Sequence, residues 1–259
     1  MTRSPTSPSF LQSPLLLGSG FVHGFSTRHG GCSHGPFASL NLGASVGDDE
    51  ERVEENHRLL AAEAHIPRAS FRTVSQVHGD EVQLLDDPHQ LGAGIEADAV
   101  ASLVPGLVPA VRTADCVPIL LADPETGWAA AIHAGWRGTE SRIAGKAVEA
   151  FSVRGSRRQG LIAAIGPAIG RCCYEVSSDL ASRFQATFGP EVASGRHLDL
   201  ALANRLTLLD AGLPADSIES MDRCTSCDSG RFFSHRRDRG ITGRHLSFIE
   251  ARAPQRRRG

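Results

Sequence analysis

The stretch VPAVRTADCVPILLADPETGWAAAIH, residues 108–133, contains three short apolar runs separated by turns. The runs cover residues 108–112, 117–122 and 128–133, and Pro, Asp or Gly bound them. Short apolar runs with such boundaries are typical of buried β-strands. No helical segment lies between them, so the stretch predicts consecutive strands and argues against regular βαβ alternation.

The rest of the chain adds further strands and four helices to this centre. Further strands are predicted at residues 71–77, 82–85, 97–102, 161–165, 218–222 and 245–249. One helix is predicted where Val53, Asn56, Leu60 and Ala64 recur at helical spacing after an acidic cluster. The other helices are predicted after Arg137, at residues 178–187 and at residues 200–211. The pattern favours an α+β fold with mixed or antiparallel sheets.

Composition restricts the partners. The 259 residues carry 27 basic and 29 acidic side chains, a net charge of −2, which argues against nucleic acid or an anionic membrane and favours a small substrate. We expect a flexible Ser- and Pro-rich leader at residues 1–20 and a basic tail at residues 251–259. Neither end resembles a targeting signal, so we expect a cytoplasmic protein with reduced thiols.

Three candidate metal ligands stand in constrained frames: His78 in SQVHG, Cys116 in TADCVP and His133 in IHAGWRGT. Two imidazoles and a thiolate suit zinc, and three protein ligands leave a fourth position for water or substrate. The ligands are too far apart in sequence for a zinc finger, so strands must bring them together. The alternative is two ordinary turn histidines and a buried cysteine that behaves as a small apolar residue.

Nine motifs together resemble the laccase-domain family, also described as polyphenol oxidases, peptidoglycan editing factors and purine nucleoside phosphorylases. They are FSTRHGG (25–31), LNLG (40–43), SQVHG (75–79), ADA (97–99), TADCVP (113–118), IHAGWRGT (132–139), IGPAIG (165–170), CCYEV (172–176) and FFSHRRD (232–238). The resemblance implies a single catalytic domain at residues 21–250, a sandwich of mixed β-sheets with helices on the outside.

The resemblance also implies a zinc-dependent purine nucleoside phosphorylase that acts on adenosine, inosine and methylthioadenosine, with adenosine deaminase activity. His78, Cys116 and His133 would be both metal ligands and catalytic residues, with Zn²⁺ as the metal and copper as a possible substitute. Zinc would lower the pKa of a bound water toward about 7. Asp115 and His29 are candidates for the general acid by their place in the motifs alone.

Phosphate and nucleoside need their own ligands. Arg137, at the start of a predicted helix, and Arg28, in a Gly-rich turn, are candidates for phosphate. From the residues alone each is more often a surface arginine, and the family resemblance favours the phosphate role for both. Asn41 and Gln76 could orient a base or ribose hydroxyl, or could only stabilise turns. Asp115 completes the set of predicted substrate ligands.

Two further segments stay open between interpretations. The pairs Cys172-Cys173 and Cys224-x-x-Cys227 are interpreted as structural thiols, because a single CxxC pair shows no second half-site in the sequence. Residues 235–237 form either a functional loop or a cationic surface turn.

Other functions use the same residues. Cys116 could be the nucleophile of a Cys-His amide hydrolase, with His133 or His78 as base. A copper-dependent polyphenol oxidase would need several coppers. A zinc-stabilised module or cell-wall precursor editing factor would act by binding. We expect a monomer or small homo-oligomer.

Overall fold

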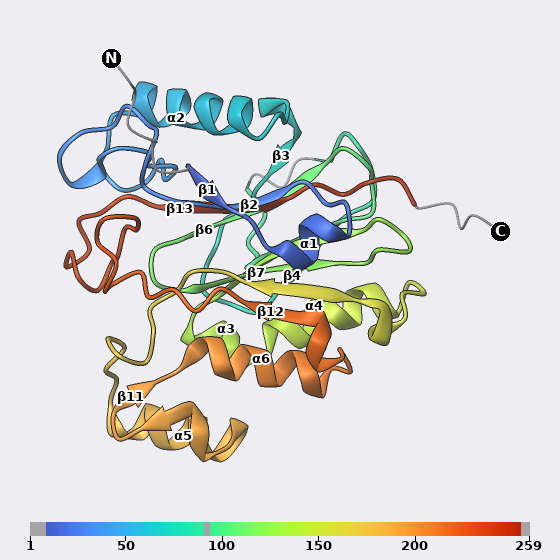
Figure 1. Cartoon of the computed structure of the whole chain (residues 1–259), viewed down its shortest axis with the longest axis vertical. Helices are drawn as coiled ribbons and strands as arrows, with labels where there is room; N and C mark the ends of the chain where they lie inside the picture. The colour runs from blue at the N-terminus through green and yellow to red at the C-terminus, as the bar shows by residue number, and fades with distance from the viewer. Residues whose placement is uncertain (1–8, 91–93, 255–259) are drawn as a thin grey trace.

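The computed structural model describes residues 9–90 and 94–254, which form two large β-sheets packed between helical layers (Figure 1). The five-stranded sheet has the order β1 (Phe10–Leu11), β2 (His23–Ser26), β13 (His245–Ile249), β6 (Val108–Thr113) and β3 (Phe71–Arg72). The six-stranded sheet has the order β12 (Ile218–Ser220), β9 (Ile162–Ile165), β7 (Val117–Ala122), β8 (Ala129–Ala134), β5 (Ala99–Ser102) and β4 (Val82–Leu85). A small hairpin joins β10 (Ala193–Ser194) to β11 (His197–Leu198).

Both large sheets are mixed. In the five-stranded sheet β3 runs parallel to β6 while the other pairs are antiparallel. In the six-stranded sheet β12 runs parallel to β9 and β4 parallel to β5. The predicted α+β sandwich of mixed sheets with outer helices is therefore confirmed.

Most of the helices cover the outer faces of the sandwich, whereas the first lies beside the layer between the two sheets. Their bounds are α1 (Pro14–Gly18), α2 (Glu50–Glu63), α3 (Trp136–Glu140), α4 (Ile143–Ser152), α5 (Ser178–Phe188) and α6 (Leu200–Asp210). Short 3₁₀ turns lie at Gly35–Phe37, Arg68–Ser70, Arg158–Gly160, Pro190–Val192 and Ala215–Ser217. Figure 1 shows α2 over the five-stranded sheet, and α3, α4 and α6 beneath the six-stranded sheet. Among the described residues, no helix has the length and apolar character needed to cross a membrane.

The central strands are apolar without interruption because both of their faces are buried. In β7, Ile119 and Leu121 pack toward the helices, whereas Leu120 packs into the layer between the sheets. In β8, Ile132 joins the helical side and Ala131 the layer between the sheets. Strands covered on both faces lose the usual alternation of apolar and polar residues, which explains the runs in the sequence.

Most predicted elements are present, and two of them differ most from the prediction. The strand predicted at 71–77 ends at Arg72, and only Ser75 makes a later bridge, to Glu96. The helix expected after Arg137 is divided into α3 and α4 by Arg142, whose φ of 58° lies in the left-handed region. The sequence did not predict β1, β2, α1 or the β10–β11 hairpin.

The ends of the fold lie outside the expected boundaries. From Ser9 onward the expected leader packs on the domain: β1 pairs with β2, and Leu16 of α1 is fully buried in the layer between the sheets. At the other end Ala251 is buried and the guanidinium of Arg252 lies 4.5 Å from the centre of the Phe21 ring. Residues 1–8 and 255–259, the remainder of the two predicted tails, lie outside the described residues.

Candidate active site

The three predicted ligands come together at one end of the sandwich. Their ligand atoms all lie within 4.8 Å of one another. Cys116 immediately precedes β7 and His133 belongs to β8, and these strands pair so that Pro118 faces His133. His78 arrives from the turn before β4, and its ring lies perpendicular to that of His133 with centres 4.9 Å apart. The sheet thus gathers ligands that are distant in sequence, as predicted.

Asp98, fully buried just before β5, fixes the positions of two ligands at once. Its Oδ1 accepts hydrogen bonds from His133 Nδ1 at 2.7 Å and from the backbone N–H of His78 at 3.0 Å. Its Oδ2 accepts from the backbone N–H groups of Val77 at 3.2 Å and Gly79 at 2.6 Å. Because Nδ1 of His133 is used by Asp98, its Nε2 is left to bind a metal.

The backbone around the ligands is also specific to this arrangement. His78 has a φ of 60°, a left-handed conformation stabilised by the hydrogen bonds of its turn to Asp98. At Gly135, a Cβ atom would lie 3.1 Å from Cδ2 of His78 and 3.3 Å from Sγ of Cys116. Glycine at this position therefore leaves room for the ligand side chains above it.

The electrostatics favour the ligand form of the thiol. Burial alone would raise the pKa of Cys116, but the facing His133 and His78 outweigh it and lower this pKa to about 6. Burial would lower the pKa of His133, whereas Cys116 and Asp98 raise it to about 9. Burial likewise raises the pKa of the Asp98 carboxyl, but its hydrogen bonds from His133 and the turn hold that pKa below the ordinary value. The thiolate is the form of cysteine that binds metals.

This ligand set fits a metal ion. Two imidazoles and one thiolate match the ligand chemistry of catalytic zinc, and imidazole and thiolate ligands also accept copper. The donor atoms are close enough to reach one ion, and a cavity lies beside them. His78, Cys116 and His133 are therefore the residues that would hold it.

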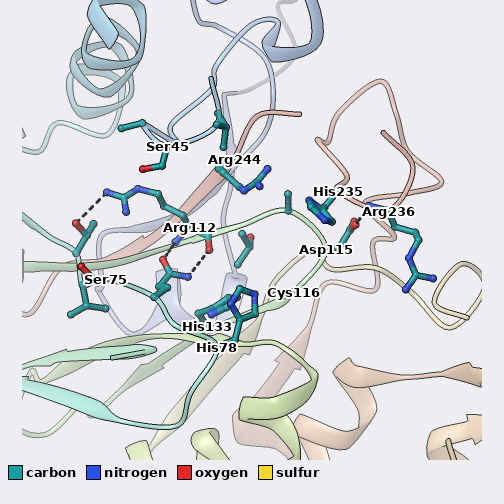
Figure 2. A pocket seen from close by; sticks show the side chains of 18 of the residues that line it. Ser45, Ser75, His78, Arg112, Asp115, Cys116, His133, His235, Arg236 and Arg244 are labelled. Carbon is teal, nitrogen blue, oxygen red and sulfur yellow. Dashed lines mark hydrogen bonds between the residues drawn. The ribbon is translucent and has the colours of Figure 1, made fainter. Parts of the chain in front are cut away.

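A cavity of about 820 Å³ opens beside the ligands (Figure 2). Its volume is within the range of small-molecule sites. Besides the three ligands it is lined by residues 43–46, 73–76, 94, 112–115, 174, 235, 236 and 244.

Two arginines that the sequence analysis did not select line this cavity. Arg112, at the end of β6, donates from Nη2 to Thr73 Oγ1 at 3.3 Å, and its buried Nε has no hydrogen-bond partner among the described residues. Arg244, just before β13, packs its side chain against Gly43, where a Cβ would lie 2.6 Å from the arginine Cγ. Burial lowers the pKa of Arg244, whereas Cys116 and Asp115 raise it. The charge of this arginine therefore interacts electrostatically with the thiol of Cys116.

Two predicted substrate ligands line the cavity but already have protein partners. The side-chain amide of Gln76 donates to the carbonyl of Arg112 and accepts from its N–H, both at 2.8 Å. Asp115, with a φ of 91°, accepts from Thr225 Oγ1 and from the N–H of Arg236, both at 2.6 Å. Both residues therefore shape the wall of the cavity.

The structure does not bring the other candidates to the cavity wall. Arg137 is exposed, with its guanidinium 4.5 Å from the centre of the Trp136 ring. Arg28 donates to the carbonyls of Ala38 and Ser229, and its neighbour His29 does not line the cavity either. Asn41 is fully buried and hydrogen-bonds within its own loop and to Arg244 N, which matches the turn interpretation.

The segment at residues 232–238 contributes to the rim. His235 and Arg236 line the cavity, while Arg236 Nη1 donates to the carbonyl of Glu175 at 2.7 Å and its guanidinium lies over the Tyr174 ring. In Figure 2 Arg236 lies on the far side of Asp115 from Arg112, and His235 lies beside Asp115. Of the two interpretations of this segment, the structure favours a loop that forms part of the site.

Comparison with known proteins agrees with this geometry. A family model described as multi-copper polyphenol oxidoreductase laccase matches residues 22–252. The purine nucleoside phosphorylase YlmD of Geobacillus stearothermophilus is 42% identical, over 90% of this chain and 91% of the relative. A purine nucleoside phosphorylase of Deinococcus radiodurans is 43% identical, over 88% of each chain. The crystal structure of YlmD from Geobacillus stearothermophilus superposes with a TM-score of 0.88 at 40% identity, covering 96% of this chain and 98% of that one.

Proposed function

Because this chain belongs to the multi-copper polyphenol oxidoreductase laccase family, we propose that it is a zinc-dependent purine nucleoside phosphorylase. Its substrates would be adenosine, inosine and methylthioadenosine, which phosphate converts to the free base and ribose 1-phosphate or methylthioribose 1-phosphate. We propose deamination of adenosine to inosine as a second reaction of the same site.

The observation that carries this proposal is the pairing of a three-ligand metal set with two cations in one cavity. His78, Cys116 and His133 supply the ligands, and Arg112 and Arg244 the positive charge. Arginine binds phosphate through charge-assisted hydrogen bonds, which are stronger than neutral ones. A site for an anionic co-substrate beside a metal suits phosphorolysis better than it suits oxidation of a neutral phenol.

Phosphorolysis breaks the C1′–N9 bond of the nucleoside and forms a C1′–O bond to phosphate, and the departing base takes up a proton. We assign phosphate binding to Arg112 and Arg244, and the support of Arg112 to the amide of Gln76, which holds its backbone. We propose that His235, on the rim, places its imidazole beside the base as the proton donor. A bound zinc would supply Lewis-acid chemistry at the ligand end of the cavity.

The decisive experiment measures products from adenosine with and without phosphate, using protein of known zinc content. We expect adenine and ribose 1-phosphate only when phosphate is present, and inosine in both conditions. Absence of free base and of ribose 1-phosphate from any purine nucleoside would refute the phosphorylase assignment.

A pair of arginine variants tests where phosphate binds. Arg244→Gln should raise the KM for phosphate by about 10- to 100-fold, because a charge-assisted hydrogen bond is lost from the cavity. Arg137→Gln serves as the control on the exposed surface and tests the sequence-based assignment of Arg137. If Arg137→Gln raises the KM for phosphate and Arg244→Gln does not, the phosphate site lies at the start of α3 and not at Arg244.

The Cys-His hydrolase is the second candidate, because Asp98, His133 and Cys116 follow one another in the order of an orienting acid, a base and a nucleophile. Such an enzyme would keep its activity in a metal chelator and would form an acyl adduct at Cys116. Loss of activity in chelator, with recovery on addition of zinc, would instead support the phosphorylase.

A further inference from the structure

Four cysteines outside the active site gather at one point. Cys172 and Cys173 follow the strand β9 by a loop, and Cys224 and Cys227 lie in the loop after β12. All four sulfur atoms lie within 4.8 Å of one another. The two pairs are more than fifty residues apart in sequence, so the second half-site that the CxxC pair lacked in the sequence is supplied by the fold.

We propose that these four cysteines form a second, structural zinc site, closed by four thiolates and separate from the His-Cys-His set. Sulfur of Cys227 lies 3.5 Å from that of Cys172 and 3.3 Å from that of Cys173. A regular tetrahedron with zinc–sulfur bonds of about 2.3 Å has edges of about 3.8 Å. The two distances to Cys227 are within about half an ångström of that edge, and no pair of the four sulfurs is more than 4.8 Å apart.

The backbone around Cys224 supports a thiolate. The N–H of Gly170 donates to Cys224 Sγ at 3.3 Å, and the N–H of Cys227 donates to the same sulfur at 3.5 Å. Hydrogen bonds of this kind orient metal ligands and disperse their charge. At Gly170 a Cβ would lie 3.3 Å from both Cys172 Sγ and Cys224 Cβ, so the small residue allows the two loops to approach.

Backbone pairing holds the two loops in register before any metal is considered. Ala168 and Cys224 form an isolated parallel bridge, in which Ala168 N donates to the carbonyl of Arg223 and Thr225 N to the carbonyl of Ala168. The cysteines therefore meet on a preformed frame. Four thiolates are the ligand set of closed structural zinc sites. The active site differs because its three protein ligands leave a fourth position open.

The position of this cluster gives it a role in shaping the active site. Tyr174, next to Cys173, and the rim residues His235 and Arg236 belong to the segments that the four cysteines join. Thr225, next to Cys224, donates to Asp115 at 2.6 Å, and the carbonyl of Asp115 accepts from Ile169 N. A metal at the cluster would thus fix one wall of the cavity without touching substrate.

The test begins with the zinc content of the purified whole protein. Wild type should hold two zinc ions per chain, the double variant Cys172→Ser/Cys227→Ser one, and Cys32→Ser two. The double variant removes the two exposed ligands, and Cys32 belongs to neither cluster, which makes its replacement a matched control. Equal zinc contents in wild type and in the double variant would overturn the proposal, whatever the active site itself holds.

A second measurement does not depend on how the double variant folds. In Cys116→Ala, which lacks the thiol of the first site, X-ray absorption at the zinc edge should show about four sulfur neighbours at about 2.3 Å. Thiol titration of denatured wild type after metal removal should return all six cysteines. Iron in place of zinc, or a titration two thiols short because a disulfide joins the cluster, would refute the site. The site is independent of the proposed activity, since it is measured without any substrate.

Discussion

Replacement of Asp98 by Asn should weaken zinc binding at the active site, although Asp98 is not one of the three proposed ligands. One carboxylate accepts four N–H hydrogen bonds, from His133 Nδ1 and from three consecutive backbone groups at His78 and its neighbours. Asparagine keeps one oxygen and turns an NH₂ group toward donors. The change therefore loosens two of the three ligands together.

The expected magnitude follows from these contacts. Loss of a partner that orients a metal ligand usually costs 10- to 100-fold in metal affinity, about 1.4 to 2.8 kcal/mol. Because Asp98 orients both His133 and the turn that holds His78, we expect the upper end, about 100-fold. Competition with a chromogenic chelator on the purified variant gives the dissociation constant directly.

The control is Asp80→Asn, the same chemical change two residues beyond His78. Asp80 makes an ion pair with Lys146 at 2.5 Å on the surface and does not touch a ligand. The zinc affinity of the Asp80→Asn variant should equal that of wild type. If Asp98→Asn retains wild-type zinc affinity while thermal unfolding shows an intact fold, the argument that this carboxylate positions the ligands is incorrect.

Three further perturbations test other features. Gly135→Ala should lower zinc stoichiometry by crowding two ligands, whereas Gly160→Ala, with open space around its Cβ position, should not; equal zinc contents would contradict the steric argument. Leu16→Ala should lower the free energy of unfolding by about 2–5 kcal/mol in urea, and the exposed Leu17→Ala should change it little, unless the N-terminal segment contributes nothing to stability. Burial lowers the pKa of His57 to about 4, so the unfolded chain takes up its proton first as pH falls below about 6.5. The contribution of His57 to the free energy of unfolding is complete above that pH and should decline by up to about 1.4 kcal/mol per pH unit toward pH 4. Urea unfolding of His57→Gln should therefore show a shallower decline of stability with falling pH than wild type.

The sequence predicted the central elements well because their signals are local. The runs at β7 and β8 are apolar on both faces, and α2 begins with Asp49 as its cap and two glutamates in its first turn. The short elements at the N-terminus were missed, since their stability comes from contacts with distant segments. Leu16 is an ordinary leucine in a Ser- and Pro-rich stretch until the fold buries it.

Residue type and motif predicted that His78, Cys116 and His133 would come together, but they did not predict the roles of the residues around them. Asp98 stood inside a recognised motif, yet its role depends on a turn twenty residues away in sequence. Arg112 had one local signal, a cation at the end of an apolar strand and four positions before Cys116. Arg244 had none, since only the pairing of β13 brings it to the cavity. Arg137 shows the opposite case, in which a motif arginine is exposed and packs over a neighbouring ring, away from the cavity.

The position of β13 has a consequence for synthesis on the ribosome. This strand lies between β2 and β6 in the middle of its sheet, although it follows every other described strand in the sequence (Figure 1). Until it emerges, β2 and β6 each expose an unpaired edge, and such edges invite pairing with other chains. A chain that stops before Arg244 would therefore keep both edges exposed, would be prone to aggregate, and would lack the side of the cavity that Arg244 forms.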